Sequence, residues 1–175
     1  MNDVPNYMAR LRIEPASFAD VPALEGLVSR CITAMRAAGI DQWDEIYPNR
    51  DTFEHDVRTD TAYVLRLDAE IVAMYVLNNQ QDPEYGDVPW VYPARNVCVV
   101  HRLMVHPGHS GRGYAWRLMH DAEDRARVAG ANVIRLDVFD ANPRACALYI
   151  GLGYRHAGHV RFRKGLVRCY EKRLG

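Results

Sequence analysis

Residues 97–130 have the sequence VCVVHRLMVHPGHSGRGYAWRLMHDAEDRARVAG, which opens with the strongest strand signal in the chain, at 97–105. A glycine-rich turn follows at 106–113. Beyond the turn, apolar residues recur at helical spacing and predict an amphipathic helix that ends at Gly130. The apolar face of that helix consists of Ala115, Leu118, Met119, Ala122, Ala126 and Ala129. The stretch therefore predicts a strand, a tight turn and a helix in direct succession.

The turn has the chemistry of an anion site. A helix N-terminus presents unpaired N–H groups and the positive end of the helix dipole, and glycines let the backbone approach a phosphate closely. Arg112 and Arg117 add positive charge nearby. No Lys-Ser/Thr pair follows the glycines and no GxGxxG occurs, so neither specific phosphate motif is present. A glycine turn can also serve only to reverse the chain, and these residues alone leave both readings open.

Alternating and helical patterns elsewhere predict a mixed α/β domain rather than a purely parallel sheet. A helix that ends at Gly39 follows the first strand, Asp51 caps a short helix to about Arg58, and Asn142 caps another that ends near Gly151. The expected strands are 8–13, 62–67, 71–77, 97–105, 133–139, about 154–163, and 166–172.

Length and composition place the chain in an ordinary class. Its 175 residues, 49% hydrophobic and 25% charged, predict one domain spanning 1–175. The apolar runs are too short for a membrane helix and the start lacks a signal-peptide pattern, which predicts no membrane partner. Four scattered cysteines without a CxxC motif favour a reduced, cytoplasmic setting. The seven histidines show no zinc-binding spacing, so we expect no metal.

Charge is balanced overall but divided along the chain. Residues 1–94 hold 16 acidic residues against 7 arginines, whereas residues 95–175 hold 15 basic residues against 6 acidic ones. The division could mark an anionic ligand on one side and a cationic ligand on the other, or the two halves could mix their charges on the surface. A net charge of zero without a Lys/Arg block argues against a nucleic-acid partner.

Two segments resemble signature motifs of the GNAT superfamily of N-acetyltransferases. Residues 103–115, LMVHPGHSGRGYA, are similar to the loop that binds the acyl-CoA pyrophosphate, Gln/Arg-x-x-Gly-x-Gly/Ala. Gly113 and Ala115 match its last two fixed positions. Ser110 stands at the Gln/Arg position, a departure that removes a side-chain contact but spares the backbone amides.

The second segment is DANPRACALYIGLGY at 140–154, which looks like the family stretch Asn-x-x-Ala-x-x-Leu-Tyr-x-x-x-Gly-Phe. Its matching residues are Asn142, Ala145, Leu148, Tyr149 and Gly153, with Tyr154 in place of the usual Phe. The pairs Gln42-Trp43 and Tyr47-Pro48 look like those of a subgroup of small GNAT proteins.

The resemblance covers the whole chain and implies the GNAT fold, in which a mixed, mostly antiparallel central sheet has a splayed parallel pair of strands and helices on both faces. It implies an acyltransferase that moves an acetyl group from acetyl-CoA to a small primary amine, by direct attack in a ternary complex. Coenzyme A would lie between the strand ending at Val105 and the strand 133–139. The residues implied to bind it are Leu103, Met104, Val105, His109, Ser110, Gly111, Arg112, Gly113, Tyr114, Ala115, Asn142, Arg144 and Tyr149.

The resemblance also implies a general acid, because Tyr149 matches the family tyrosine whose hydroxyl faces the coenzyme A sulfur. A phenol with a pKa of about 10 suits protonation of a departing thiolate. For the general base we name His101, whose intrinsic pKa is near neutral. Strict alternation would place His101 on the face shared by Val99, Leu103 and Val105. Competing candidates for the base are Asp44, Glu45 and Asp137.

Two irregular segments, 39–48 and 78–94, carry aromatic residues that could line an acceptor pocket. We name Trp43 and Tyr47 as substrate-binding candidates, with Trp90 and Tyr92 beside them. The same rings could instead pack loop against sheet or mediate a homodimer. Two other functions remain open, namely a non-catalytic coenzyme A sensor and an acetyltransferase of a protein N-terminus or tRNA.

Overall fold

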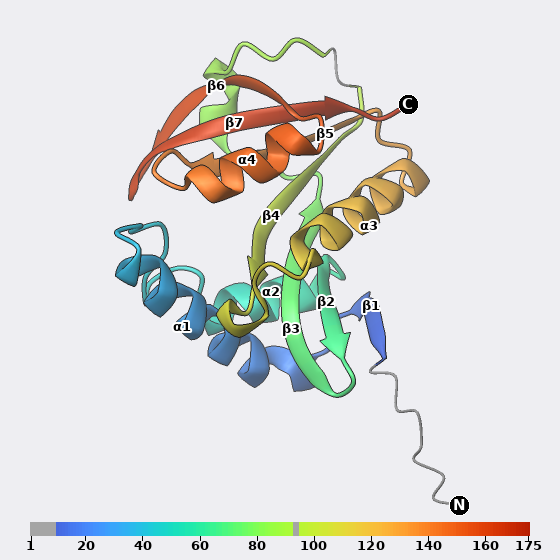
Figure 1. The fold of residues 1–175 in the computed structure, drawn as a ribbon. Helices are drawn as coiled ribbons and strands as arrows, with labels where there is room; N and C mark the ends of the chain where they lie inside the picture. The colour runs from blue at the N-terminus through green and yellow to red at the C-terminus, as the bar shows by residue number, and fades with distance from the viewer. Residues whose placement is uncertain (1–9, 93–94) are drawn as a thin grey trace, which may run out of the picture.

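The computed structural model describes residues 10–92 and 95–175. It contains one seven-stranded sheet with the order β1-β2-β3-β4-β5-β7-β6 and confirms the predicted mixed α/β class (Figure 1). The strands are β1 (Leu11–Pro15), β2 (Ala62–Leu67), β3 (Glu70–Asn78), β4 (Val97–Val105), β5 (Val133–Phe139), β6 (Arg155–Phe162) and β7 (Gly165–Arg173). The helices are α1 (Val21–Ala37), α2 (Arg50–Arg58), α3 (Tyr114–Val128) and α4 (Pro143–Gly151), with short 3-10 turns η1 (Phe18–Asp20), η2 (Pro83–Asp87) and η3 (Pro107–His109).

The parallel pair β4–β5 joins two otherwise antiparallel parts of the sheet. On one side lie β1, β2 and β3, and on the other β7 and β6. The pairing of β4 with β5 runs from Val97 opposite Val133 to Val100 opposite Leu136 and then stops. The two strands therefore form a fork, as the resemblance implied.

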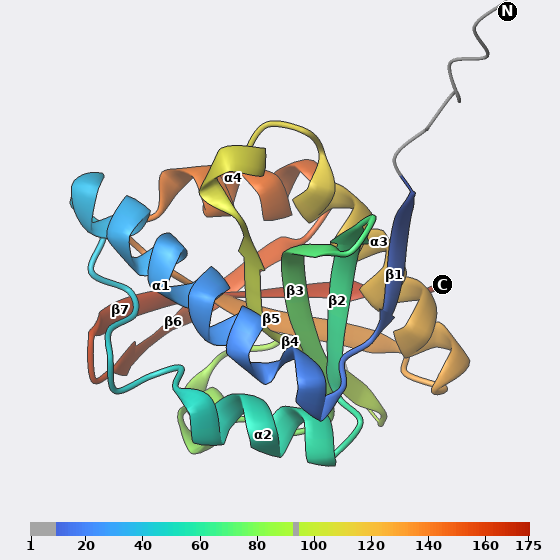
Figure 2. The ribbon, with the colours of Figure 1, turned by 90° about the horizontal axis from the view of Figure 1, so that it is seen from below.

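Helices cover both faces of the sheet (Figures 1 and 2). The α3–α4 core, which includes Leu118, Met119, Leu136 and Tyr149, lies on one face. The α1–α2 core, which includes Leu24, Leu27, Phe53, Val64 and Met74, lies on the other. A third group, the η2 cluster, consists of Tyr85, Val88, Val99, Val160, Val167 and Cys169.

Two details of the predicted elements need correction. Asn49, rather than Asp51, caps α2, because its Oδ1 accepts the N–H of Thr52 at 3.0 Å. Asp51 lies inside the first turn, where a carboxylate still favours the helix dipole. The first strand runs over Leu11–Pro15 instead of 8–13, and positions 8 and 9 fall outside the described residues. Within the described ranges, no helix is both long and apolar enough to pass through a bilayer.

Candidate active site

The fork between β4 and β5 is the centre of the candidate site. Beyond Val100 and Leu136 the two strands no longer pair, so His101 and Asp137 are the first positions past the branch point. The backbone of β4 from Leu103 to Val105 then borders the gap. This unpaired strand edge can hydrogen-bond an extended ligand arm in the way a neighbouring strand would.

A β-bulge at Arg102 changes which side chains face the gap. Arg102 has a φ of +51°, and the pairing with β3 shifts there, from Val76 opposite His101 to Met74 opposite Met104. Val99 packs in the η2 cluster, whereas Leu103 and Val105 pack against the α3–α4 core. The expectation that His101 shares the face of Leu103 and Val105 is therefore wrong, because the extra residue reverses the alternation after His101.

The glycine turn leads directly into the N-terminus of α3. Gly111 and Gly113 have φ values of +80° and +78°, which residues with a side chain rarely adopt. A Cβ atom at either position would meet nothing within 4 Å, so the turn faces open space. Gly113 is the N-cap of α3, and the first amides of the helix are free to bind an anion.

The aromatic side chains of this turn are partly buried, and its polar side chains are exposed. His109 stacks on Tyr114 with 6.2 Å between ring centroids, and His106 Nδ1 accepts the N–H of Gly108 at 3.0 Å. Ser110 and Arg112 are exposed, and Ala115 is half-buried in the first turn of α3. The predicted phosphate-binding residues thus form one continuous surface, with aromatic packing beneath exposed backbone.

The opposite wall of the gap begins with α4. Asn142 caps this helix, since its Oδ1 accepts the N–H of Ala145 at 3.1 Å, and its Nδ2 donates to Gln42 Oε1 at 3.3 Å. The second contact ties the start of α4 to the α1–α2 loop. Arg144 is exposed in the first turn and is free to meet a phosphate.

Tyr149 lies on the inner face of α4 and is 6% exposed. Its ring packs against those of Tyr154 and Tyr170, with centroid distances of 5.9 and 6.0 Å. Burial, and next the carboxyl of Asp137, raises the pKa of the Tyr149 phenol above its usual value. Tyr149 therefore stays protonated near neutral pH, as a proton donor must.

The imidazole of His101 contacts the side-chain amide of Asn78 and is a weak proton acceptor. Its Nε2 lies 3.0 Å from Asn78 Oδ1. Burial, and next the charge of Arg102, lowers the pKa of His101 to about 4. The imidazole is consequently neutral near pH 7, and its conjugate acid would form only with difficulty.

Asp137 stands opposite His101 across the fork and has a partner that the sequence did not reveal. Tyr85, on η2, donates its hydroxyl to Asp137 Oδ2 at 2.7 Å. Burial raises the pKa of Asp137 to about 6, although the hydrogen bond from Tyr85 opposes the rise. Asp82, at the start of η2, adds a second negative group and contributes to the raised pKa.

Arg102 connects the bulge to α2 and to the α1–α2 loop. Its Nε and Nη2 donate to both oxygens of Asp56 at 2.9 and 2.6 Å, and its Nη1 donates to the Tyr47 hydroxyl at 2.5 Å. The contact with Tyr47 brings that predicted pocket residue to the fork, although 41% of Tyr47 remains exposed. Trp43 is placed differently, because its ring belongs to the α1–α2 core.

The remaining candidates for the general base, Asp44 and Glu45, form ion pairs, and Asp44 also accepts backbone hydrogen bonds. Asp44 accepts hydrogen bonds from Arg163 and from the N–H of Ile46, and the first of these chiefly holds its pKa well below the usual range. The hydrogen bond from Arg36 lowers the pKa of Glu45 to about 2. Neither carboxylate would take up a proton near neutral pH.

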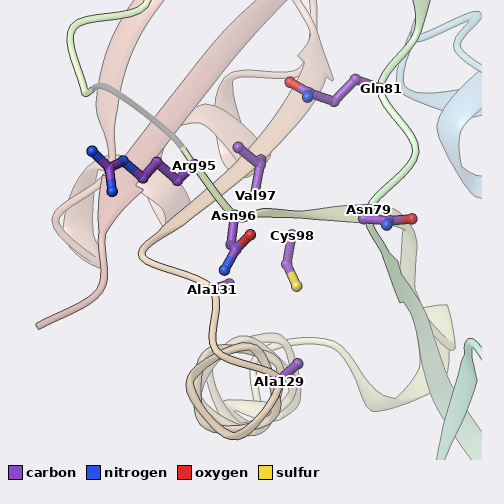
Figure 3. Close-up of a pocket in the computed structure, with 8 residues that line it drawn as sticks. All are labelled: Asn79, Gln81, Arg95, Asn96, Val97, Cys98, Ala129 and Ala131. Carbon is purple, nitrogen blue, oxygen red and sulfur yellow. The ribbon is translucent and has the colours of Figure 1, made fainter.

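A separate hollow lies at the far end of β4 (Figure 3). It has a volume of about 350 Å³ and is lined mainly by polar groups and small side chains. Its lining residues are Asn79, Gln81, Arg95, Asn96, Val97, Cys98, Ala129 and Ala131. Val97 and Cys98 open β4, whereas the glycine turn follows Val105, so this hollow and the glycine turn lie at opposite ends of the strand. Across the described ranges, no three or more His, Cys, Asp or Glu side chains are placed to share a metal ion.

The sequence of this chain matches the family model described as the Acetyltransferase (GNAT) family over residues 28–154. The chain belongs to the GNAT family of acetyltransferases. As a member of that family it is an acyltransferase of the N-acetyltransferase type. The matched region extends from α1 through the glycine turn to the end of the segment that contains Tyr149.

Individual relatives support this GNAT assignment. The chain is 25% identical to the uncharacterized N-acetyltransferase YesJ of Bacillus subtilis over 149 residues, 82% of this chain and 81% of YesJ. A GNAT-family acetyltransferase from Streptococcus agalactiae superposes with a TM-score of 0.82 at 20% identity, covering 93% of this chain and 95% of that one. The acetyltransferase YncA of Salmonella typhimurium, whose structure holds acetyl-CoA, gives a TM-score of 0.67 at 17% identity and 94% coverage of each chain.

Proposed function

We propose that this protein transfers an acetyl group from acetyl-CoA to a primary amine, by direct attack of the amine while both substrates are bound. The observation that carries the proposal is the β4–β5 fork, which opens beyond Val100 and Leu136 between the glycine turn and the buried Tyr149. Family membership and the acetyl-CoA in the YncA structure support the choice of donor.

The chain offers a fitting surface for coenzyme A. The amides from His109 to Ala115 would hold the diphosphate, since the turn faces open space and ends in a helix N-terminus. The backbone of Leu103, Met104 and Val105 would pair with the pantetheine arm, and an N–H in this segment would stabilise the negative oxygen that develops during attack. Asn142 and Arg144 would complete the binding surface on α4.

Tyr149 would supply the proton for the departing thiolate. It is protonated near neutral pH, and the nearby negative charge of Asp137 further disfavours the phenolate. A protein that only senses coenzyme A has no use for such a donor, so Tyr149 favours catalysis over a regulatory module.

On the acceptor side, the groups exposed by the fork favour a cation. Asp137 and Asp82 are negative groups near the branch point, and Tyr47 reaches the same region through Arg102. An ammonium group is attracted by carboxylates and by aromatic faces. We therefore expect alkylamines to be better acceptors than alcohols or carboxylates.

The proposal is tested by two measurements on the full chain. Calorimetry with coenzyme A should show binding, and thiol release from acetyl-CoA should depend on an added amine. A suitable panel is putrescine, spermidine, tyramine, alaninamide and a hexapeptide that begins with alanine. Turnover of the peptide alone would redirect the proposal to protein N-termini, and binding without any turnover would favour a sensor. Absence of coenzyme A binding would overturn the proposal altogether.

A further inference from the structure

Two side chains from different strands flank the fork on the same face of the sheet. His101 follows Val99 in strict alternation on β4, and Val99 lies in the η2 cluster. Asp137 is paired with Cys169 of β7 and hydrogen-bonded to Tyr85, and both of these residues belong to the η2 cluster. Because the β4–β5 pairing ends one position earlier, His101 and Asp137 both border the opening.

His101 is neutral near pH 7, whereas the carboxylate of Asp137 is negatively charged and has no ion-pair partner among the described residues. Among the described residues, no Lys, Arg or His lies within salt-bridge distance of its carboxylate, although Asp56, Asp44 and Glu171 each have such a partner. Tyr85 engages Oδ2, which leaves Oδ1 without a hydrogen bond in the part of the chain that the structure describes. The Asp137 side chain is half-buried, and a partly desolvated carboxylate without a charged partner is stabilised when a cation reaches it from outside.

We propose that Asp137, positioned by Tyr85, binds the ammonium group of the acceptor and takes up its proton. This inference rests on the proposed acetyl transfer and deepens it, because it assigns the catalytic base to β5 instead of to His101. Tyr85 acts as a positioning residue, since it orients the carboxylate and touches neither substrate.

The proton transfers balance as follows. The ammonium gives one proton to Asp137, and the resulting neutral amine attacks the thioester carbon. A C–N bond forms, the C–S bond breaks, and the thiolate takes the proton of Tyr149. The second proton lost from nitrogen restores the Tyr149 phenol through water, and Asp137 returns its proton to solvent. One proton is released for each acetyl group transferred.

The ionisation of Asp137 fits this task. With its pKa raised to about 6, the carboxylate is charged at pH 7 yet is more basic than an ordinary aspartate. The titratable groups that interact with it come from several neighbouring elements: Asp82 at the N-cap of η2, Tyr85 of η2, Tyr149 of α4, Cys169 of β7, and Tyr47 of the α1–α2 loop. On β4, His101 is the position across the fork, and the guanidinium of Arg102 is held by Asp56.

The decisive test is the pH profile of kcat/KM with the amine of the panel that is turned over fastest. Wild type should lose activity on the acidic side with a midpoint near pH 6. Asp137→Asn should lower kcat/KM at pH 7.5 by roughly 100-fold or more, abolish the acidic limb, and leave the Kd for coenzyme A within twofold. Tyr85→Phe should move the limb to higher pH, because the lost hydrogen bond lowered the pKa of Asp137.

A second tyrosine–aspartate pair provides the matched control. Tyr75 donates to Asp121 Oδ2 at 2.5 Å on the α3 side of the sheet, the face opposite to that of Asp137. Tyr75→Phe and Asp121→Asn should leave the midpoint of the limb unchanged. If the Asp137 variant fails to fold, the shift in Tyr85→Phe decides the matter.

Three outcomes would overturn the assignment. One is an Asp137→Asn variant that retains more than a third of wild-type kcat/KM. Another is a Tyr85→Phe profile that superimposes on that of wild type. The last is loss of the acidic limb in His101→Gln together with its retention in Asp137→Asn. A wild type that binds no coenzyme A or acetylates no amine would instead refute the proposed function itself.

Discussion

At the scale of single residues, the site depends on how burial tunes a few ionisable groups. Burial lowers the pKa of His101 and raises those of Asp137 and Tyr149. Desolvation disfavours the charged form of each group, so it weakens an imidazole base and strengthens a carboxylate base. Near pH 7, Asp137 is therefore ionised and able to accept a proton, whereas Tyr149 is protonated and able to donate one.

Replacement of Tyr149 by Phe should separate catalysis from binding. The variant keeps the ring contacts with Tyr154 and Tyr170 but lacks the hydroxyl. We expect kcat to fall by roughly 100-fold or more while the Kd for coenzyme A changes little. Steady-state kinetics and calorimetry measure the two quantities, and an equal loss of both would contradict the role of proton donor.

At the scale of elements, the turn before α3 and the caps of the helices decide local geometry. Gly113 and Gly130 flank α3 with the same φ of +78°, and a Cβ at either would meet nothing within 4 Å. Alanine at either position thus meets the same backbone strain without a steric clash. Only Gly113 belongs to the proposed phosphate surface.

Gly113→Ala and Gly130→Ala should therefore have similar effects on stability and different effects on binding. We expect each to lower the free energy of unfolding by about 1–2 kcal/mol. Only Gly113→Ala should weaken coenzyme A binding, because its methyl group projects into the space that the diphosphate would occupy. Urea denaturation and calorimetry test both parts, and equal affinities in the two variants would argue against a diphosphate at this turn.

The cap of α2 gives a further element-scale prediction. Asn49→Ala should lower the free energy of unfolding by about 1 kcal/mol, because the N–H of Thr52 loses its acceptor. Asp51→Ala, which leaves the cap intact, should cost less. Urea denaturation of both variants measures the difference, and the reverse order would restore Asp51 as the cap.

At the scale of the whole molecule, the half-buried Asp137 should make stability depend on pH. Its pKa is about 6 in the folded protein and near 4 in an unfolded chain, so the folded state binds more protons between these values. Stability contributed by the protonated carboxyl is therefore complete below about pH 4 and is lost as the pH rises through about 6. Ionisation of this carboxylate at neutral pH therefore lowers the stability of the folded protein.

Comparison of wild type with Asp137→Asn isolates this effect from other titrating groups. The stability of wild type relative to the variant should decline by roughly 2–3 kcal/mol between pH 4 and pH 8. Urea denaturation at several pH values measures the difference. A constant difference across this range would mean that Asp137 titrates normally in the folded protein.

Much of the fold was predictable because it follows from local periodicity. The strand, turn and helix over 97–130 and the hairpin of β2 and β3 lie close to their expected positions. The bulge at Arg102 was not predictable, since VCVVHRLMV contains no glycine or other marker of an extra residue. Arg102, which forms the bulge, is held by Asp56, 46 positions earlier, and local periodicity does not show such a contact.

In the site, too, the features carried by contiguous motifs were predictable and those that depend on long-range contacts were not. The glycine turn and Tyr149 belong to contiguous motifs, so the sequence alone was enough to predict them as site residues. Tyr85 lies in a polar, proline-punctuated loop, and only the folded chain brings its hydroxyl to Asp137, 52 positions later. For Trp43 the sequence left a pocket role and packing of the loop open, and the structure places its ring in the α1–α2 core.

The extra residue at Arg102 also divides β4 into two segments with independent duties. The part before it directs His101 to the face of the η2 cluster, and the part after it directs Leu103 and Val105 towards the α3–α4 core. In the proposed mechanism, substitutions that change the preferred amine can therefore accumulate upstream of the bulge, while the segment proposed to bind the thioester downstream is left unchanged. A catalyst arranged in this way is well suited to acquiring new acceptors, by evolution or by design, while it keeps the same acyl donor.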